Sequence, residues 1–173
     1  NSGFLKNGCK IEKIKSYEDG NWWVQDYSSF APLNFIENEI IGNSCIDLCS
    51  APGGKSFQIL SKNKAILLND KSKNKIRILK ENLERLRFKA KISNFDVLKM
   101  KSFRKFDFIV LDAPCSSIGT IRKNPEIFFK KQGPNFRELI SLQKKLLEKS
   151  SKLLNEGGII IYMVCSFLKQ ETV

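Results

Sequence analysis

Two cysteines and an aspartate follow two apolar runs of the sequence, and these residue types can carry out nucleophilic and acid–base chemistry. Asp112 and Cys115 come after the run FDFIVL, and Cys165 comes directly after IIIYMV. A thiolate can add to an electrophilic carbon, although a single cysteine is more often a small buried hydrophobe. The chain has no histidine, which excludes Ser-His-Asp and Cys-His mechanisms. Catalysis must therefore use carboxylates, lysines, thiols, water or a bound cofactor.

A glycine-bearing turn follows an earlier apolar run. It consists of the residues Cys49, Ser50, Ala51, Pro52, Gly53, Gly54 and Lys55. Glycines after a strand let a ligand approach the backbone, and the N-terminus of a following helix favours negative charge. The string matches neither the P-loop nor the G-x-G-x-x-G pattern. It therefore predicts a ligand-binding turn outside those two motifs.

Asp70 ends the next apolar run of the sequence. An acidic residue at that place can accept hydrogen bonds from both ribose hydroxyls of an adenosine-bearing cofactor. The alternative is that Asp70 is only the N-cap of the helix predicted at 71–88. The glycine turn favours the cofactor interpretation.

The segment Asp112–Thr120 follows the strongest apolar run. Pro114 has no N–H group, so the chain should leave the sheet there. The basic pair Arg122 and Lys123 comes next, which suits a nearby phosphate backbone. We therefore expect this loop to lie between a cofactor and a nucleic acid.

The order of apolar and amphipathic segments predicts a parallel α/β sheet. Apolar runs predict strands at 44–48, 65–68, 91–93, 106–111 and 159–164. Amphipathic patterns predict helices at 55–61, 71–88 and 136–154. Such strands are typical of a sheet covered by helices on both faces, where ligands bind at the carboxyl ends of the strands. We expect a core domain at 44–173 and an N-terminal appendage at 1–43, with an amphipathic helix at Phe30–Ile41.

The composition narrows the class of protein further. The 173 residues suit a single domain, and 30 Lys and Arg against 18 Asp and Glu give a net charge of +12. That charge predicts a polyanionic partner, unless the proteome is simply rich in lysine. The 5 cysteines include no C-x-x-C pair, so we expect reduced thiols in the cytoplasm and neither a disulfide framework nor a metal site. No apolar run approaches the roughly 20 residues that span a bilayer.

Three strings resemble, in order, signature motifs of the RNA 5-methylcytosine methyltransferases of the Sun/Fmu family. They are CSAPGGK at 49–55, DAPCSSIGTIRKNPE at 112–126 and YMVCS at 162–166. The segment WVQDYSS at 23–29 resembles the V-Q-D-x-[SA]-S segment that precedes the catalytic core of that family. The resemblance implies a Rossmann-like class I methyltransferase fold that binds S-adenosylmethionine and acts on RNA, with ribosomal RNA expected and transfer RNA as the alternative.

The resemblance implies how the cofactor would be held. Residues 49–55 would wrap its methionine part, Asp70 would hold the ribose, and Asp96 would lie beside the adenine. Asp112 would lie between the cofactor and the target base.

Two thiols have distinct implied roles in the reaction. Cys165 would be the nucleophile that adds to C6 of cytosine, which turns C5 into a carbon that can attack the cofactor's methyl group. Protonated Asp112 would stabilise the charge at N3, and Cys115 would help release the product. Lys55 or the cofactor's positive charge would favour the Cys165 thiolate. The target base must leave its stack to reach the pocket.

The sequence departs from the family pattern in places. Val164 stands where the family usually has Thr, and Ser117 stands where Gly is common. The chain neither begins with Met nor continues far beyond Cys165. We therefore expect a fragment, truncated after the fifth strand and without a separate RNA-binding domain, that binds cofactor weakly and has little activity alone. Its oligomeric state is not predicted beyond an assumed monomer, and a eukaryotic source would imply a nucleolar location.

Two alternatives stay open at this point, and a third is disfavoured. A DNA cytosine-5 methyltransferase would use Cys115 as its nucleophile and would need no cysteine after the fifth strand. Adenine N6 methylation is disfavoured, because the fourth strand ends in DAPC. A non-catalytic RNA-binding remnant would bind RNA without cofactor.

Overall fold

A five-stranded parallel sheet forms the centre of the computed structural model, which describes residues 3, 5, 9–42, 44–101, 104–129 and 133–172. The strand order is β3-β2-β1-β4-β5, and all neighbouring strands pair in parallel. The strands are β1 (Cys45–Asp47), β2 (Ile66–Asn69), β3 (Lys91–Ser93), β4 (Phe106–Asp112) and β5 (Leu154–Met163). The predicted parallel α/β fold is confirmed.

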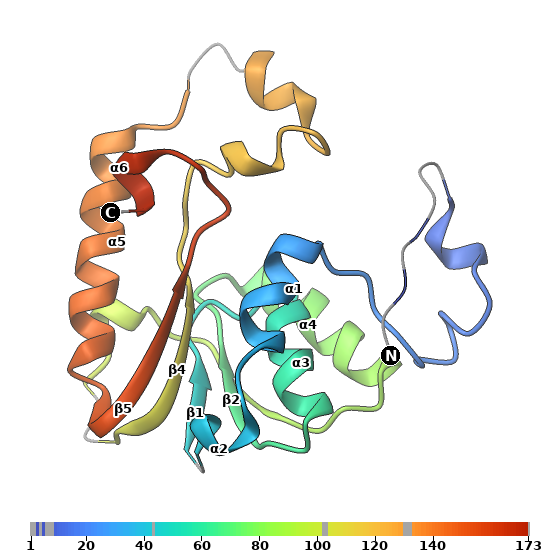
Figure 1. The fold of residues 1–173 in the computed structure, drawn as a ribbon, viewed down its shortest axis with the longest axis horizontal. Helices are drawn as coiled ribbons and strands as arrows, with labels where there is room; N and C mark the ends of the chain where they lie inside the picture. Colours follow the sequence, from blue (N-terminus) through green and yellow to red (C-terminus); the bar gives the residue numbers. More distant parts are fainter. Residues whose placement is uncertain are drawn as a thin grey trace.

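Helices cover both faces of the sheet (Figure 1). One face packs against α1 (Tyr27–Asn34), α3 (Gly54–Ser61) and α4 (Lys73–Arg85). The other face packs against α5 (Phe136–Ser151) and the short helix η2 (Val97–Lys99). The helix α4 shows why the pattern folds this way. Its buried residues recur at helical spacing and face the sheet, and they are Ile76, Leu79 and Leu83.

The junction between α5 and β5 differs from the prediction. The helix begins at Phe136 as expected, but it ends at Ser151 and the strand already begins at Leu154. The Asn155 side chain donates a hydrogen bond to the Asp107 carboxylate at 2.6 Å. That contact keeps residues 154–158 beside β4. The pairing of β4 with β5 shifts its register between Phe106 and Phe108.

The single helix predicted at Phe30–Ile41 is wrong. The structure has α1, which begins earlier at Tyr27, and a separate short helix α2 (Asn38–Ile41). The Lys62 ammonium donates hydrogen bonds to the carbonyl oxygens of Leu33 at 3.2 Å and Ile36 at 2.5 Å. A cation at these carbonyls stabilises the end of a helix, so a residue distant in sequence ends α1 before α2 begins.

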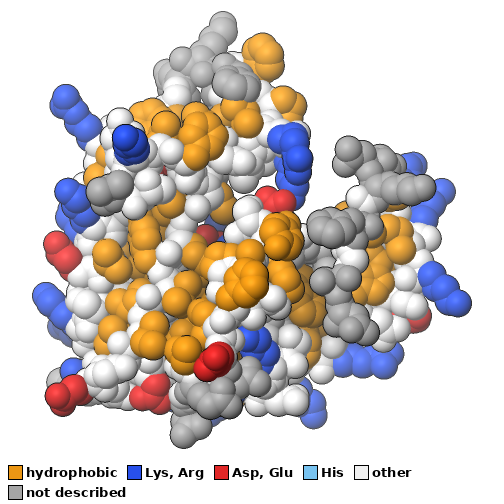
Figure 2. Space-filling view, in the orientation of Figure 1, with side chains coloured by type: hydrophobic (Ala, Val, Ile, Leu, Met, Phe, Trp, Pro, Cys, Tyr) orange, Lys and Arg blue, Asp and Glu red, His pale blue; other side chains and the backbone are white. Residues whose placement is uncertain are grey.

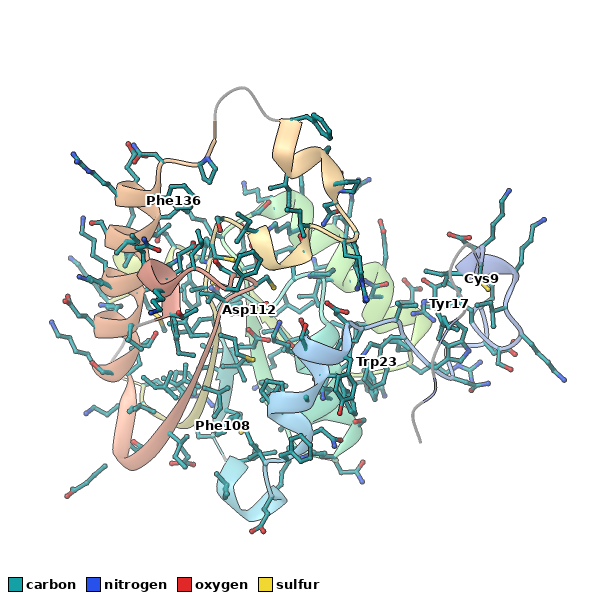
Figure 3. All side chains as sticks on the ribbon, turned by 45° about the horizontal axis from the view of Figure 1, so that its top comes forward. Cys9, Tyr17, Trp23, Phe108, Asp112 and Phe136 are labelled. Atoms are coloured by element: carbon teal, nitrogen blue, oxygen red, sulfur yellow. The ribbon has the colours of Figure 1, made fainter. Side chains whose placement is uncertain are left out.

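The segment before β1 packs on the helices of the core. The Trp23 ring meets the rings of Phe57 and Phe88 edge-on, with centroids 5.9 Å and 6.3 Å away (Figure 3). The Gln25 amide donates a hydrogen bond to the Gln58 side chain at 2.7 Å. These contacts fix the N-terminal segment beside α3 and the glycine turn.

The remaining short helices flank the carboxyl ends of β4 and β5. After β4 come η3 (Ile118–Thr120) and η4 (Pro125–Phe129), and after β5 comes α6 (Lys169–Thr172). The remaining short helix, η1 (Ile11–Lys13), lies before the sheet in the sequence and does not belong to this group. None of the helices in the described part of the chain combines the length and apolar character needed to cross a membrane.

Candidate active site

An ion pair joins the glycine turn to the end of β4. Lys55 lies in the first turn of α3, and its ammonium is 2.6 Å from the carboxylate of Asp112, the last residue of β4. The Lys55 side chain is 11% exposed and that of Asp112 is 28% exposed. Figure 3 shows Asp112 near the centre of the molecule. A partly buried pair of this kind is held more firmly than a surface pair.

A second acid, which the sequence analysis did not single out, lies beneath the turn. Asp47 ends β1 and is 1% exposed; its carboxylate accepts hydrogen bonds from the Ser56 hydroxyl at 2.6 Å and the Cys49 N–H at 3.3 Å. Burial raises the pKa of Asp47 to about 7, and the charge of Asp112 adds to this effect. An acidic residue inside the apolar run SCIDL was the signal that could have revealed it.

The turn itself needs glycine at one position. Gly53 has φ +120°, and a Cβ atom there would lie 2.0 Å from the Phe57 ring. The Phe57 ring therefore packs directly against the bare backbone at this point. Cys49 belongs to the same turn, and burial raises the pKa of its thiol to about 12, so this cysteine is not a nucleophile.

The two acids predicted to hold the cofactor lie at the ends of β2 and β3. Asp70 is 6% exposed, and its carboxylate accepts hydrogen bonds from the N–H groups of Ala51 at 3.3 Å and Ser72 at 2.8 Å. Ser72, and not Asp70, is the N-cap of α4. Asp96 is the N-cap of η2 and pairs with Lys71 at 2.9 Å, and its hydrogen bond from Lys71 lowers its pKa.

These residues fit an adenosine-bearing cofactor. Each Asp70 oxygen keeps acceptor capacity beyond its one hydrogen bond, as the ribose hydroxyls of such a cofactor require. Across the described ranges, the acidic and thiol side chains form no cluster that could hold a metal ion.

Two thiols meet between the loops that follow β4 and β5. The Cys115 and Cys165 side chains interact, and this interaction lowers the pKa of Cys115 to about 6 while it raises the pKa of Cys165. The titrations of the two thiols are therefore linked, since ionisation of one disfavours ionisation of the other. The loops also interlock through the backbone, since the Gly119 N–H donates to the Cys165 carbonyl at 3.0 Å.

The predicted catalytic residues line two neighbouring cavities. A cavity of about 510 Å³ is lined by Lys55, Asp112, Val164 and Cys165, together with α1 residues. Cys115 lines a second cavity, on the side of α5. The structure thus brings the nucleophile candidate, the acid and the lysine to one cavity, with Cys115 in the wall beside them.

One departure from the family motif has a backbone consequence. Ser117 adopts φ +59°, in the left-handed region that favours glycine. The preference for glycine at this position therefore follows from the turn that leads into η3.

The fold and this site define a Rossmann-like methyltransferase. The chain belongs to the family described as 16S rRNA methyltransferase RsmB/F, whose model matches residues 32–173. It is 34% identical over 172 residues to ribosomal RNA small subunit methyltransferase B of Pectobacterium atrosepticum, with 96% of this chain covered. The chain spans 40% of the length of that relative.

Two solved structures from Pyrococcus horikoshii share this arrangement. NSun6, crystallised with SFG, superposes with a TM-score of 0.81 at 29% identity, over 94% of this chain and 43% of its own. A methyltransferase homologue superposes with a TM-score of 0.74 at 28% identity, over 95% of this chain and 52% of its own. Family membership confirms the predicted resemblance.

Proposed function

We propose that the protein transfers a methyl group from S-adenosylmethionine to C5 of a cytosine in ribosomal RNA, through a covalent bond between Cys165 and C6. The observation that carries this proposal is that Cys165 lines one cavity with the ion pair of Lys55 and Asp112, with the interacting thiol of Cys115 next to it. The rRNA methyltransferase family supports the class of reaction.

The proposed division of the chain follows from the site. Residues 44–173 would supply the methyltransferase core and residues 1–43 an appendage, whose Gln25 amide donates a hydrogen bond to Gln58 of α3. In the core, residues 49–55 and Asp70 would hold the cofactor, and Asp96 would lie beside its adenine. The cofactor supplies an electrophilic methyl group when it is bound. That cofactor is supported by the relative crystallised with SFG.

The side chains of this site can move the protons that the reaction requires. As Cys165 adds to C6, its proton passes to the neighbouring Cys115 sulfur, with which it interacts. Asp112 receives a proton from Lys55, 2.6 Å away, and donates it toward N3 of the base. Once the Cys115 thiol has lost its proton to water, it can take the C5 proton, so that Cys165 leaves as a thiolate and the proton on N3 returns through Asp112 to Lys55. The absence of histidine from the chain is no obstacle to this sequence of steps.

An RNA partner suits the surface around the cavity. Figure 2 shows hydrophobic side chains at the middle of one face and lysine or arginine side chains around its margin. Phe167, 66% exposed, lines the cavity of Cys165, and an exposed ring can stack on an unpaired base. Lys123 pairs at 3.0 Å with Asp26, which lines this cavity, and it can instead contact a phosphate.

The test is a comparison of two cysteine variants in the full-length protein that carries this sequence. RNA containing 5-fluorocytidine lacks the C5 proton that must leave, so the enzyme should stay attached to it. We expect a denaturation-resistant adduct with the wild type and with Cys115→Ser, and none with Cys165→Ser. The control Cys9→Ser changes an exposed thiol far from the site and should behave as the wild type. No adduct with the wild type would refute the proposed mechanism.

A second assignment of the nucleophile is favoured by one observation. The environment of Cys115 lowers its pKa and so favours a thiolate at this sulfur, and attack through Cys115 is the mechanism expected of DNA cytosine-5 methyltransferases. In that case Cys115→Ser would abolish the adduct and Cys165→Ser would keep it. The same experiment therefore separates the two assignments.

A further inference from the structure

A buried carboxylate outside the predicted site holds the loop that carries Cys115. Glu171 lies in α6, yet it is only 3% exposed. Its carboxylate accepts hydrogen bonds from the Ser116 N–H at 2.9 Å, the Ser116 hydroxyl at 2.5 Å and the Gln143 amide at 3.1 Å. Burial opposes the ionisation of Glu171, but these hydrogen bonds outweigh it and lower its pKa.

The hydrogen bonds of Glu171 fix both neighbours of Cys115. Ser116 is bonded directly, and the Gln143 amide that contacts Glu171 also donates to the Pro114 carbonyl at 2.9 Å. The backbone on either side of the thiol is therefore anchored to one carboxylate. Hydrogen bonds to a charged group are stronger than hydrogen bonds between neutral groups. The Glu171 carboxylate therefore holds the Cys115 loop more firmly than neutral contacts would.

The same contacts connect the Cys115 loop to the segment that carries Cys165. Glu171 lies in α6, the short helix that follows Cys165 in the sequence. The Ser116 hydroxyl also lies 3.4 Å from the hydroxyl of Ser166. Glu171 thus joins the two loops at a point behind the sulfurs, on the side of α5.

We propose that Glu171 is a positioning residue that holds Cys115 in reach of the methylated base and so sets the rate of product release. This inference rests on the proposed function. In the release step the Cys115 thiolate takes the C5 proton, the C5–H electron pair forms the C5–C6 double bond, and the C6–S bond breaks. Cys165 leaves as a thiolate and Cys115 becomes a thiol.

A displaced Cys115 loop would affect this step more than the earlier ones. Attack by Cys165 and methyl transfer take place in the cavity of Lys55 and Asp112, which Glu171 does not line. A displacement of about 1 Å can cost about 100-fold in rate. Loss of Glu171 should therefore leave the enzyme attached to methylated RNA.

The test uses Glu171→Ala and Glu171→Gln in the full-length protein, with unmodified substrate RNA. We expect Glu171→Ala to lower kcat by about 10- to 100-fold, with methyl transfer in a single turnover nearly unchanged and a larger trapped fraction on denaturing gels. Glu171→Gln, which keeps an acceptor for the Ser116 N–H, should lie between Ala and wild type. The control Glu148→Gln changes an exposed carboxylate on α5 and should have no effect.

Other outcomes would overturn the inference. If kcat, single-turnover transfer and the trapped fraction fall together in Glu171→Gln, Glu171 has only a structural role. If Glu171→Ala does not fold, the variant Ser116→Ala is tested in its place. Ser116→Ala removes the hydroxyl contact with Glu171 and keeps the N–H contact. A trapped fraction unchanged in Ser116→Ala would refute the positioning role of Glu171. A wild type that methylates RNA without any Cys165 adduct would refute the proposed mechanism instead, before Glu171 is tested.

Discussion

The buried carboxylate of Asp47 should make the stability of the protein fall as the pH rises. Its pKa rises from 3.8 to about 7 on folding, mainly through burial. Between these two pH values the folded state binds a proton that the unfolded state has lost, so the free energy of unfolding decreases. Above about pH 7 both states are ionised and the loss is complete. At 1.36 kcal/mol for each pH unit, the loss amounts to about 4 kcal/mol.

The variant Asp47→Asn should remove this pH-dependent loss of stability and keep the hydrogen bonds that the side chain at position 47 makes. The Asn oxygen can accept from the Cys49 N–H, and its amide can donate to Ser56 if that hydroxyl turns to accept. We therefore expect the variant to be more stable than the wild type by about 4 kcal/mol at pH 8 and by only about 1 kcal/mol at pH 4.5.

The assay is urea unfolding of both proteins across this pH range, since the difference between them cancels the other titrating groups. An exposed carboxylate provides the control, and Asp19→Asn should follow the wild-type curve. A difference that stays constant from pH 4.5 to pH 8 would show that Asp47 ionises at little cost and would refute the reasoning. A variant less stable than the wild type at pH 8 would refute it as well.

Two further predictions concern the cofactor region. Asp70→Asn should weaken S-adenosylmethionine binding about 10- to 100-fold in isothermal titration, because hydrogen bonds to a charged acceptor contribute about 1.5–3 kcal/mol; an unchanged Kd would contradict the assigned role. Gly53→Ala should destabilise the fold by about 2 kcal/mol or more in thermal unfolding, since its φ is +120° and its Cβ would meet Phe57. Gly54→Ala is the matched control, because its Cβ would lie 3.5 Å from Gln25, an ordinary contact; equal losses in both variants would contradict the argument.

The strands and the main helices could be predicted because their signals are local. Continuous apolar runs mark buried parallel strands, and the spacing of Ile76, Leu79 and Leu83 marks one face of a helix. The helix predicted at Phe30–Ile41 fails for the opposite reason, since the ammonium of Lys62 ends α1 from another part of the chain. No pattern within residues 30–41 contains that contact.

The sequence by itself determined the glycine turn, the acids after β2 and β4, and the two cysteines that follow β4 and β5. It could do so because ligand-binding residues of a parallel sheet follow the carboxyl ends of its strands. Only the tertiary structure decided which of these side chains meet. The ion pair of Lys55 with Asp112 and the interaction of the two thiols depend on β1, β4 and β5 lying side by side. The raised pKa of Asp47 and the anchoring by Glu171 arise from burial, which depends on how distant segments pack together.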